Sequence, residues 1–156
     1  MRQPSKTETT VIAPTPSDGR DDSLTHWVKL AYLSMRKEME ASLRAQGLTL
    51  TQWKALGALL HRPGTTHSDL VRLLEVEAPS VTSLVNGMEK HGWVRQERSA
   101  TDARVKRLFL TTQGRHTIRT ARVACAPVES RMEAALPEDD RAELKRLLRM
   151  VIDGLQ

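Results

Sequence analysis

The sequence predicts a mainly α-helical fold with one small β-hairpin, an α+β arrangement in which helices dominate. Two patterns favour it. Apolar residues recur at spacings of three and four through most of the chain from residue 22 onward, and two short strand-like runs, 93–98 and 104–110, interrupt this pattern. At 156 residues the chain has about the size of one domain.

The first 21 residues differ in composition from the rest. They are rich in Pro, Ser and Thr and contain few large apolar side chains. Ordering such a segment costs conformational entropy that little apolar burial offsets. We therefore expect a disordered N-terminal arm over 1–21 and one folded domain over 22–156.

Two helices are expected at the start of that domain. Apolar residues from Leu24 to Leu43 recur at helical spacing over about 22–46, and Gly47 follows them. Thr51 is expected to cap the next helix, which Pro63 ends because proline cannot continue a helical hydrogen-bond ladder.

A helix-turn-helix is expected next. Thr66 and Asp69 have the spacing of an N-terminal cap for a short helix, and a second helix starts near Pro79. Its apolar residues fall on one face. The opposite face carries short polar side chains, which could contact base edges in a major groove. The base-facing candidates are Pro79, Ser80, Thr82, Ser83 and Asn86.

The segment 93–122 has a larger net positive charge than the whole chain. It holds eight Lys and Arg against two acids, a net charge of +6 in a chain whose total is +5. A basic surface beside a polar-faced helix suits a polyanion, because each neutralised phosphate releases counterions. A charge run alone could be only a solvated face, but the adjoining helix and hairpin favour double-stranded DNA as the partner.

These motifs resemble the MarR family of winged helix-turn-helix regulators, nearest to its SlyA-like branch. The resemblance rests on LTLTQWKALGALL, on SDLVRLLEVEAPSVTSLVNGMEKHGWV, and on the wing pattern Asp102-x-Arg104 followed by Leu110-Thr111-x-x-Gly114. It implies a winged helix-turn-helix over about 50–110. It also implies that helices over about 22–46 and 111–155 form a dimerisation region.

The residues of the terminal helices independently favour a homodimer. A small domain has too little surface to cover two further apolar faces, so a second copy is the expected partner. Cys125, the single cysteine of the chain, lies in the apolar series of the helix that starts near residue 111. We expect a dimer seam there and therefore an unreactive thiol. The two series are Ile118, Ala121, Cys125, Val128, Met132 and Ala135, and Leu144, Leu147, Leu148, Val151, Ile152 and Leu155.

The resemblance also assigns roles on the wing. Arg104 would enter the minor groove, Asp102 would orient its guanidinium, and Lys106 and Arg107 would lie near phosphates. The dimer would then bind a pseudo-palindromic operator whose half-sites are about 10 base pairs apart.

A small-molecule effector site is expected from the same resemblance, between the dimerisation and DNA-binding regions. Aromatic and cationic side chains there could hold a small aromatic acid or a phenol. The alternative is that the two tryptophans only fill the core. The candidate residues are Trp27, Tyr32, Arg36, Trp53 and Arg95.

No catalytic, cofactor-binding or metal-binding motif is present. The five histidines lack metal-ligand spacing, and no glycine-rich phosphate loop occurs. No apolar stretch has the length of a membrane span or of a signal peptide, so a cytoplasmic location is expected. We therefore expect that the protein is not an enzyme and that it is a ligand-responsive repressor. The alternatives are a ligand-independent SlyA-like regulator that competes with other DNA-bound proteins, and a winged-helix module that binds proteins.

Overall fold

The computed structural model describes residues 22–99 and 105–156. It divides into two units, 1–34 and 35–156. Helix α1 (Leu24–Arg44) begins in the first unit and ends in the second. The expected N-terminal arm, 1–21, lies outside the described residues, so its disorder stays a prediction.

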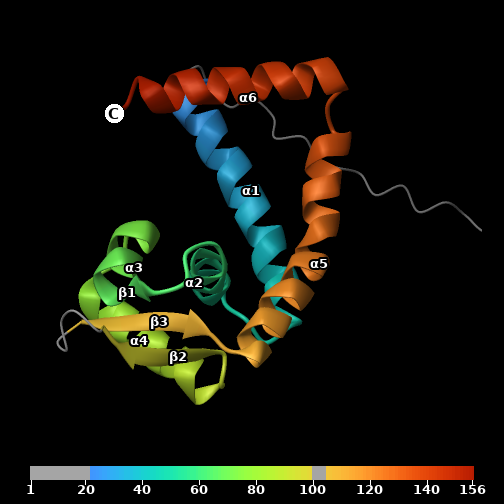
Figure 1. Cartoon of the computed structure of the whole chain (residues 1–156). Coiled ribbons are helices and arrows are strands. Elements are labelled where there is room, and N and C mark those ends of the chain that lie inside the picture. Colours follow the sequence, from blue (N-terminus) through green and yellow to red (C-terminus); the bar gives the residue numbers. More distant parts are fainter. Residues whose placement is uncertain (1–21, 100–104) are drawn as a thin grey trace, which may run out of the picture. The chain divides into compact units, whose positions relative to one another are not determined.

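The second unit contains five more helices and three short strands among its described residues. The strands form one antiparallel sheet in the order β1-β3-β2. A mainly helical fold with one small sheet confirms the predicted fold class (Figure 1). The elements are α2 (Leu50–His61), β1 (Thr65–Thr66), α3 (His67–Leu74), α4 (Ala78–Lys90), β2 (Val94–Arg98), β3 (Lys106–Leu110), α5 (Thr112–Ala134) and α6 (Glu138–Asp153).

Helix α2 begins at a different cap from the expected one. Thr49 Oγ1 accepts a hydrogen bond from the Gln52 backbone N at 3.2 Å, and Gln52 Oε1 accepts one from the Thr49 backbone N at 2.9 Å. This reciprocal pair is a capping box. The prediction of Thr51 as the cap was wrong because α2 already begins at Leu50, so Thr51 lies inside the first turn of the helix.

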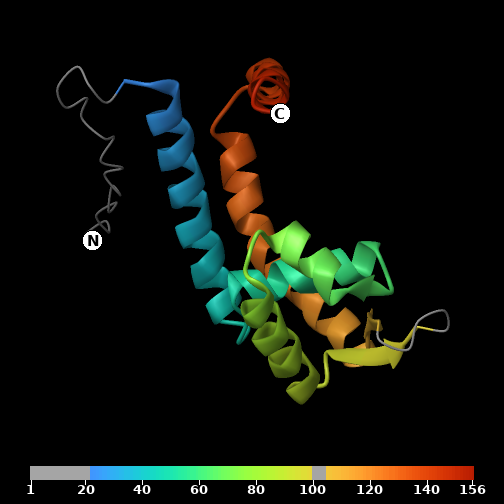
Figure 2. The same cartoon turned by 90° about the vertical axis from the view of Figure 1, so that its left-hand side faces the viewer.

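The sheet contains a strand that the sequence did not predict. β1 pairs antiparallel with β3, and Thr65 lies opposite Leu108. On its other edge, β3 pairs with β2 from Val94–Leu110 to Arg98–Lys106, which is the predicted hairpin. The chain turns sharply after α4, and β2 then runs away from that helix (Figure 2).

The core of the second unit joins side chains from α1 to α5. Helices α2, α3 and α4 bury one apolar face each, and β3 adds Leu108. This continuous core holds the helix-turn-helix and the sheet together as one lobe, defined here as residues 50–110. The fully buried side chains of the core include Leu43, Leu56, Leu59, Leu70, Val81, Val85, Met88, Leu108 and Ile118.

Helix α5 belongs to this core as far as Val128, which corrects the predicted dimer seam. Ile118, Ala121, Cys125 and Val128 are all buried by the chain itself, with at most 5% exposure. The core of the same chain covers them, so the prediction that they face a second copy was wrong. Burial raises the pKa of the Cys125 thiol, and Glu129 adds to that shift, so an unreactive thiol is still favoured.

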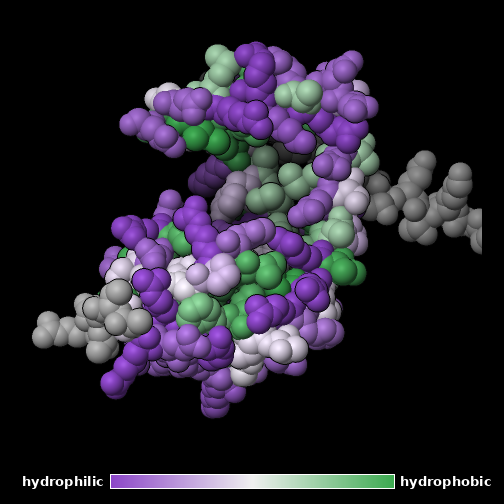
Figure 3. Space-filling view, in the orientation of Figure 1, coloured by the Kyte–Doolittle hydropathy of each residue, from purple (hydrophilic) through white to green (hydrophobic). Residues whose placement is uncertain are grey.

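Most of the remaining apolar residues of α5 and α6 are exposed, and Val151 is half-buried. Met132 is 49% exposed, and none of the α6 residues is buried. Apolar surface shows among the charged side chains of α6, at the top of Figure 3. On α6 the exposed large side chains are Leu144, Leu147, Leu148, Met150 and Ile152, and Leu155 follows the helix.

A tight junction fixes the start of α5 against the end of α4. Thr111 Oγ1 accepts from the Gly114 backbone N at 3.0 Å and donates to the Gly92 carbonyl at 2.6 Å. Gly114 packs so closely that a Cβ there would lie 2.0 Å from the Trp93 carbonyl oxygen. The close packing of this junction therefore explains why the Thr111-x-x-Gly114 motif has a threonine and a glycine at these positions.

Candidate nucleic-acid interface

Helix α4 separates its residues into a buried face and an exposed polar face. Val81, Val85 and Met88 are buried in the lobe. Because a helix repeats every 3.6 residues, the intervening side chains point outward. The exposed residues include all five base-facing candidates: Pro79, Ser80, Thr82, Ser83 and Asn86.

The first turn of α4 leaves polar groups free for a partner. Thr82 Oγ1 donates to the Ala78 carbonyl at 3.2 Å, which leaves its oxygen able to accept a further bond. Glu77, at the N-cap, makes no side-chain capping bond. The backbone N–H groups of this turn are therefore not satisfied by the cap side chain.

The turn between α3 and α4 contains one unusual backbone conformation. Glu75 adopts a left-handed conformation with φ of 54°, and its backbone N donates to the Val71 carbonyl. This ends α3 and redirects the chain toward α4. Glycine would be the unstrained residue at this position.

Two of the predicted wing cations lie on β3 with exposed side chains. Lys106 faces Arg98 across the hairpin, and Arg107 Nη1 lies 3.4 Å from the Gly64 carbonyl. They lie on the strand next to β2, which packs on α4, and exposed cations there fit a surface for phosphates. Asp102 and Arg104 fall outside the described residues, so their roles stay predictions.

A groove that the sequence did not reveal lies between the start of α3 and β3. Its volume is about 390 Å³, and it is lined by Thr66, His67, Ser68, Val105 and Lys106. Burial lowers the pKa of the His67 imidazole, Lys106 lowers it further, and Glu89 opposes them. The sequence marked Lys106 as basic, but only the strand pairing places it near His67.

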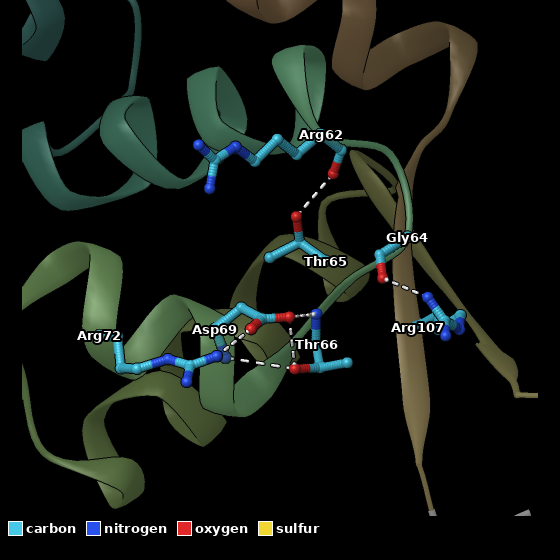
Figure 4. A network of polar contacts seen from close by, with 7 residues as sticks. All are labelled: Arg62, Gly64, Thr65, Thr66, Asp69, Arg72 and Arg107. Carbon is cyan, nitrogen blue, oxygen red and sulfur yellow. Dashed lines mark hydrogen bonds and ion pairs between the residues drawn. The ribbon is translucent and has the colours of Figure 1, made fainter. Parts of the chain in front are cut away.

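A second groove of about 400 Å³ lies on α3 next to the end of α2. It is lined by Arg62, Pro63, Gly64, Thr65, Asp69, Arg72 and Leu73. Figure 4 shows Asp69 between Thr66 and Arg72. These hydrogen bonds, from the Thr66 backbone first, hold the pKa of Asp69 at about 2. The predicted cap of α3 by Thr66 and Asp69 is confirmed.

The effector candidates of the second unit have different neighbours. The Trp53 Nε1 atom is buried and has no hydrogen-bond partner within the described part of the chain. Arg36 pairs with Glu40 at 2.7 Å. Arg95 pairs with Glu97 and lies 5.0 Å from the centre of the Phe109 ring. Both arginines are therefore already engaged by other side chains.

The other two effector candidates lie in the first unit. Trp27 and Tyr32 are each 44% exposed on α1. Trp27 Nε1 donates to Asp22 Oδ1 at 3.0 Å. Exposed aromatic rings of this kind are available to a ligand or to another chain.

Neither a metal site nor a membrane span is found in the described residues. Over 22–99 and 105–156, no three His, Cys, Asp or Glu side chains could together hold a metal ion. Within the same ranges, no helix is both long enough and apolar enough to cross a bilayer.

Comparison with known proteins shows which family the lobe resembles. Residues 46–105 match the family model described as MarR family. A solved structure of the repressor CouR, bound to a 23-mer DNA duplex, superposes with a TM-score of 0.76 and 26% identity over 83% of this chain and 92% of that one. The fold is therefore that of a MarR-type winged helix, and residues 46–105 resemble the MarR family.

Two further MarR-type relatives resemble most of the chain. An uncharacterized HTH-type transcriptional regulator from Bacillus subtilis, YwoH, is 28% identical over 83% of this chain and 93% of its own. The transcriptional repressor Rv2887 from Mycobacterium tuberculosis is 28% identical over 73% and 82% of the two chains. Its structure in complex with p-aminosalicylic acid has a TM-score of 0.68 at 25% identity and covers 83% of this chain and 98% of that chain.

Proposed function

We propose that this MarR-type winged-helix protein is a sequence-specific DNA-binding transcription regulator that acts as a repressor. The observation that carries the proposal is that one lobe presents both the exposed polar face of α4 and the exposed cations of β3. A helix with short polar side chains can contact base edges, while flanking cations neutralise phosphates. The DNA-bound structure of CouR, a repressor with the same fold, supports this use of the lobe.

The regulator is proposed to bind DNA as a homodimer. The exposed apolar residues of α6 and the end of α5 require a cover, and a second copy supplies one with the same chemistry. Two lobes related by a two-fold axis would contact a pseudo-palindromic operator whose half-sites are about 10 base pairs apart. One α4 would enter each major groove.

A selection experiment tests whether the protein recognises DNA sequence. The purified protein would be mixed with a random duplex library, and bound duplexes would be amplified and sequenced over several rounds. We expect an enriched inverted repeat. A matched selection with Asn86→Ala should enrich a changed base at one position of each half-site, because Asn86 is a base-facing candidate. Enrichment of no common sequence would contradict the proposal.

Three wing variants distinguish contacts to the DNA backbone from contacts in the minor groove. Lys106→Ala should weaken binding to all sequences about equally and reduce the dependence of log affinity on log salt by about one per lobe. Arg104→Ala should weaken binding most where the flanks are A·T-rich, since a narrow minor groove concentrates negative potential. Asp102→Ala should resemble a milder Arg104→Ala. Unchanged affinities in folded Asp102→Ala and Arg104→Ala proteins would end the minor-groove assignment.

A small aromatic acid or phenol is proposed to release the repressor from its operator. The complex of Rv2887 with p-aminosalicylic acid shows that a repressor of this family binds such a compound. In this chain, the buried Trp53 Nε1 donor has no partner among the described residues and could donate to a carboxylate or hydroxyl. We keep Trp27, Tyr32, Arg36 and Arg95 as the other proposed contacts.

A ligand screen tests the effector part of the proposal. Aromatic carboxylates and phenols would be screened by thermal shift, and each hit would then be added to a titration of the selected duplex. A coupling of about 1–3 kcal/mol would weaken DNA binding roughly five- to 150-fold. Trp53→Phe keeps the aromatic ring but removes the N–H donor, so it should weaken the effect of the ligand.

One observation favours the alternative of a ligand-independent, SlyA-like regulator. Arg36 and Arg95, the cations expected to hold an acidic ligand, are each paired with a glutamate. A regulator of this kind would act by competing with other DNA-bound proteins. If no compound in the screen changes operator affinity, this alternative becomes the better account.

A further inference from the structure

We propose that the groove between α3 and β3 is a binding site for a DNA backbone phosphate, with His67 and Lys106 as its two cationic contacts. This inference rests on the proposed function, because it places one phosphate of the bound duplex beside the wing. It assigns a role to His67 and Ser68, which neither the charge pattern nor the helix-turn-helix motif had singled out.

The first argument is the shape and chemistry of the groove. Its lining brings together an imidazole, a hydroxyl and an ammonium from two elements, over about 390 Å³. Ser68 and Lys106 are exposed, while His67 is half-buried. Each of these three side chains can donate a hydrogen bond to a phosphate oxygen, the imidazole best when it is protonated.

The second argument is the position of the groove relative to the α4 and β3 surfaces. β3 supplies Lys106 to the groove, and α4, which packs on β2 and α3, carries the base-facing candidates. A duplex that places α4 in its major groove and the wing in its minor groove has a strand of phosphates passing between them. The groove is lined by the start of α3 and by the start of β3, and α3 also packs against α4.

The charges around His67 explain its state in the free protein. Lys106 on β3 lowers the pKa of His67, and Glu89 on α4 raises it, but burial has the largest effect and lowers it. Arg98 on β2 lies opposite Lys106. Asp69 on α3 itself is held by the Thr66 hydroxyl and backbone N–H. The imidazole is therefore mainly neutral at pH 7 before DNA binds.

A phosphate in the groove reverses this balance. Its negative charge would offset Lys106 and favour the protonated imidazole, which would then donate to a phosphate oxygen. Binding would take up a proton at His67 wherever the pH lies between the two pKa values. By linkage, DNA affinity should rise as the pH falls from 7.5 toward 6, and the pH dependence should flatten once the free protein is also protonated.

The test measures affinity for one mixed-sequence duplex of roughly 24 base pairs, long enough for two half-sites, at low and constant ionic strength. Between pH 7.5 and 6 the wild-type protein should bind more tightly by up to roughly tenfold for each lobe, the scale expected from one group whose pKa is raised by the bound phosphate. His67→Gln should remove most of this pH dependence. His67→Lys, with a fixed charge, should bind more tightly than wild type at pH 7.5 and show a flat profile.

Two controls keep the result specific. His116→Gln changes an exposed histidine on α5 and should retain the wild-type pH dependence. Inorganic phosphate alone, followed by the NMR titration of the His67 ring protons, should leave the His67 pKa unchanged at millimolar concentration, whereas the duplex should raise it. A shift produced equally by inorganic phosphate would overturn the assignment to the DNA backbone.

The outcomes separate this inference from the proposed function. If the protein binds no duplex at any pH, the proposed function itself fails. If it binds DNA but His67→Gln keeps the wild-type pH dependence, DNA binding stands and the role of His67 is overturned. If His67→Lys binds no more tightly than His67→Gln at pH 7.5, the groove does not hold a phosphate.

Discussion

The lobe of residues 50–110 and helix α6 have similar apolar periodicity but opposite burial. In the lobe, α2, α3 and α4 each have fully buried apolar side chains, such as Leu56, Leu70 and Val85. In α6 none of the residues is buried, and Leu148 remains 39% exposed. The difference shows that periodicity identifies an apolar face but does not say which chain covers it.

The largest expected effect comes from placing a charge on the exposed face of α6. Leu148→Glu should weaken self-association roughly a thousandfold, because a symmetric interface loses two buried leucines at about 1.5–3 kcal/mol each. Sedimentation velocity at micromolar concentration would detect the monomer. Arg149→Gln makes the same change in net charge at the neighbouring position and should leave the dimer intact. A stable, folded wild-type monomer would contradict the proposed interface.

The next largest effect is expected inside the chain, at the junction of α5 with the lobe. Gly114→Ala should lower the free energy of unfolding by about 3 kcal/mol, because its Cβ would lie 2.0 Å from a backbone oxygen that cannot move cheaply. Gly57→Ala is the matched control, since nothing lies within 4 Å of a Cβ there. It should be neutral or stabilise the protein by up to about 1 kcal/mol. Chemical denaturation measures both.

A smaller effect is expected at the cap of α3, and it should depend on pH. The pKa of Asp69 is lowered to about 2 in the folded chain, so its contribution is present above its ordinary pKa and is lost as the pH falls through about 2. Asp69→Asn should therefore destabilise the protein by about 1 kcal/mol at pH 7 and by less at pH 3. Denaturation of both proteins at several pH values checks this, and Asp153→Asn serves as the control. An equal loss at every pH would contradict the charge-based explanation.

The smallest effect is expected at the turn between α3 and α4. Glu75→Gly should raise the free energy of unfolding by up to about 1 kcal/mol, because glycine adopts the observed left-handed conformation without strain. Thermal denaturation would measure the gain. Glu75→Ala keeps a Cβ and should show no such gain. If both variants change stability equally, strain at this position is not the cause.

The lobe and the terminal helices also differ in how well the sequence predicted them. Local signals sufficed for the α3 cap, since Thr66 and Asp69 are three residues apart, and for the exposed face of α4. The same spacing rule would have found Thr49 with Gln52 as the α2 cap. Strand β1 was missed because two residues carry no periodicity and pair only through the tertiary fold. The prediction of a dimer seam at Ile118 was wrong because the burial of a residue depends on packing that the sequence does not show.

The candidate site shows the same limit. Lys106 and the polar residues of α4 could be chosen from charge and helical spacing, but His67 could not, because it is 39 residues away from Lys106 in the numbering. Only the antiparallel pairing of β1 with β3 brings the start of α3 next to the wing. A site built from segments that are distant in the sequence can be identified only once the topology of the fold is known.

Hydroxyl-radical footprinting on the selected duplex tests the central claim most directly, because it reports both DNA recognition and the symmetry of the complex. We predict two protected regions related by a two-fold axis, with centres about one helical turn apart, and protection of the flanking minor grooves by the wings. Leu148→Glu should lose both regions together at concentrations where wild type is bound. A single protected region, or protection without two-fold symmetry, would contradict a dimer that places one lobe on each half-site.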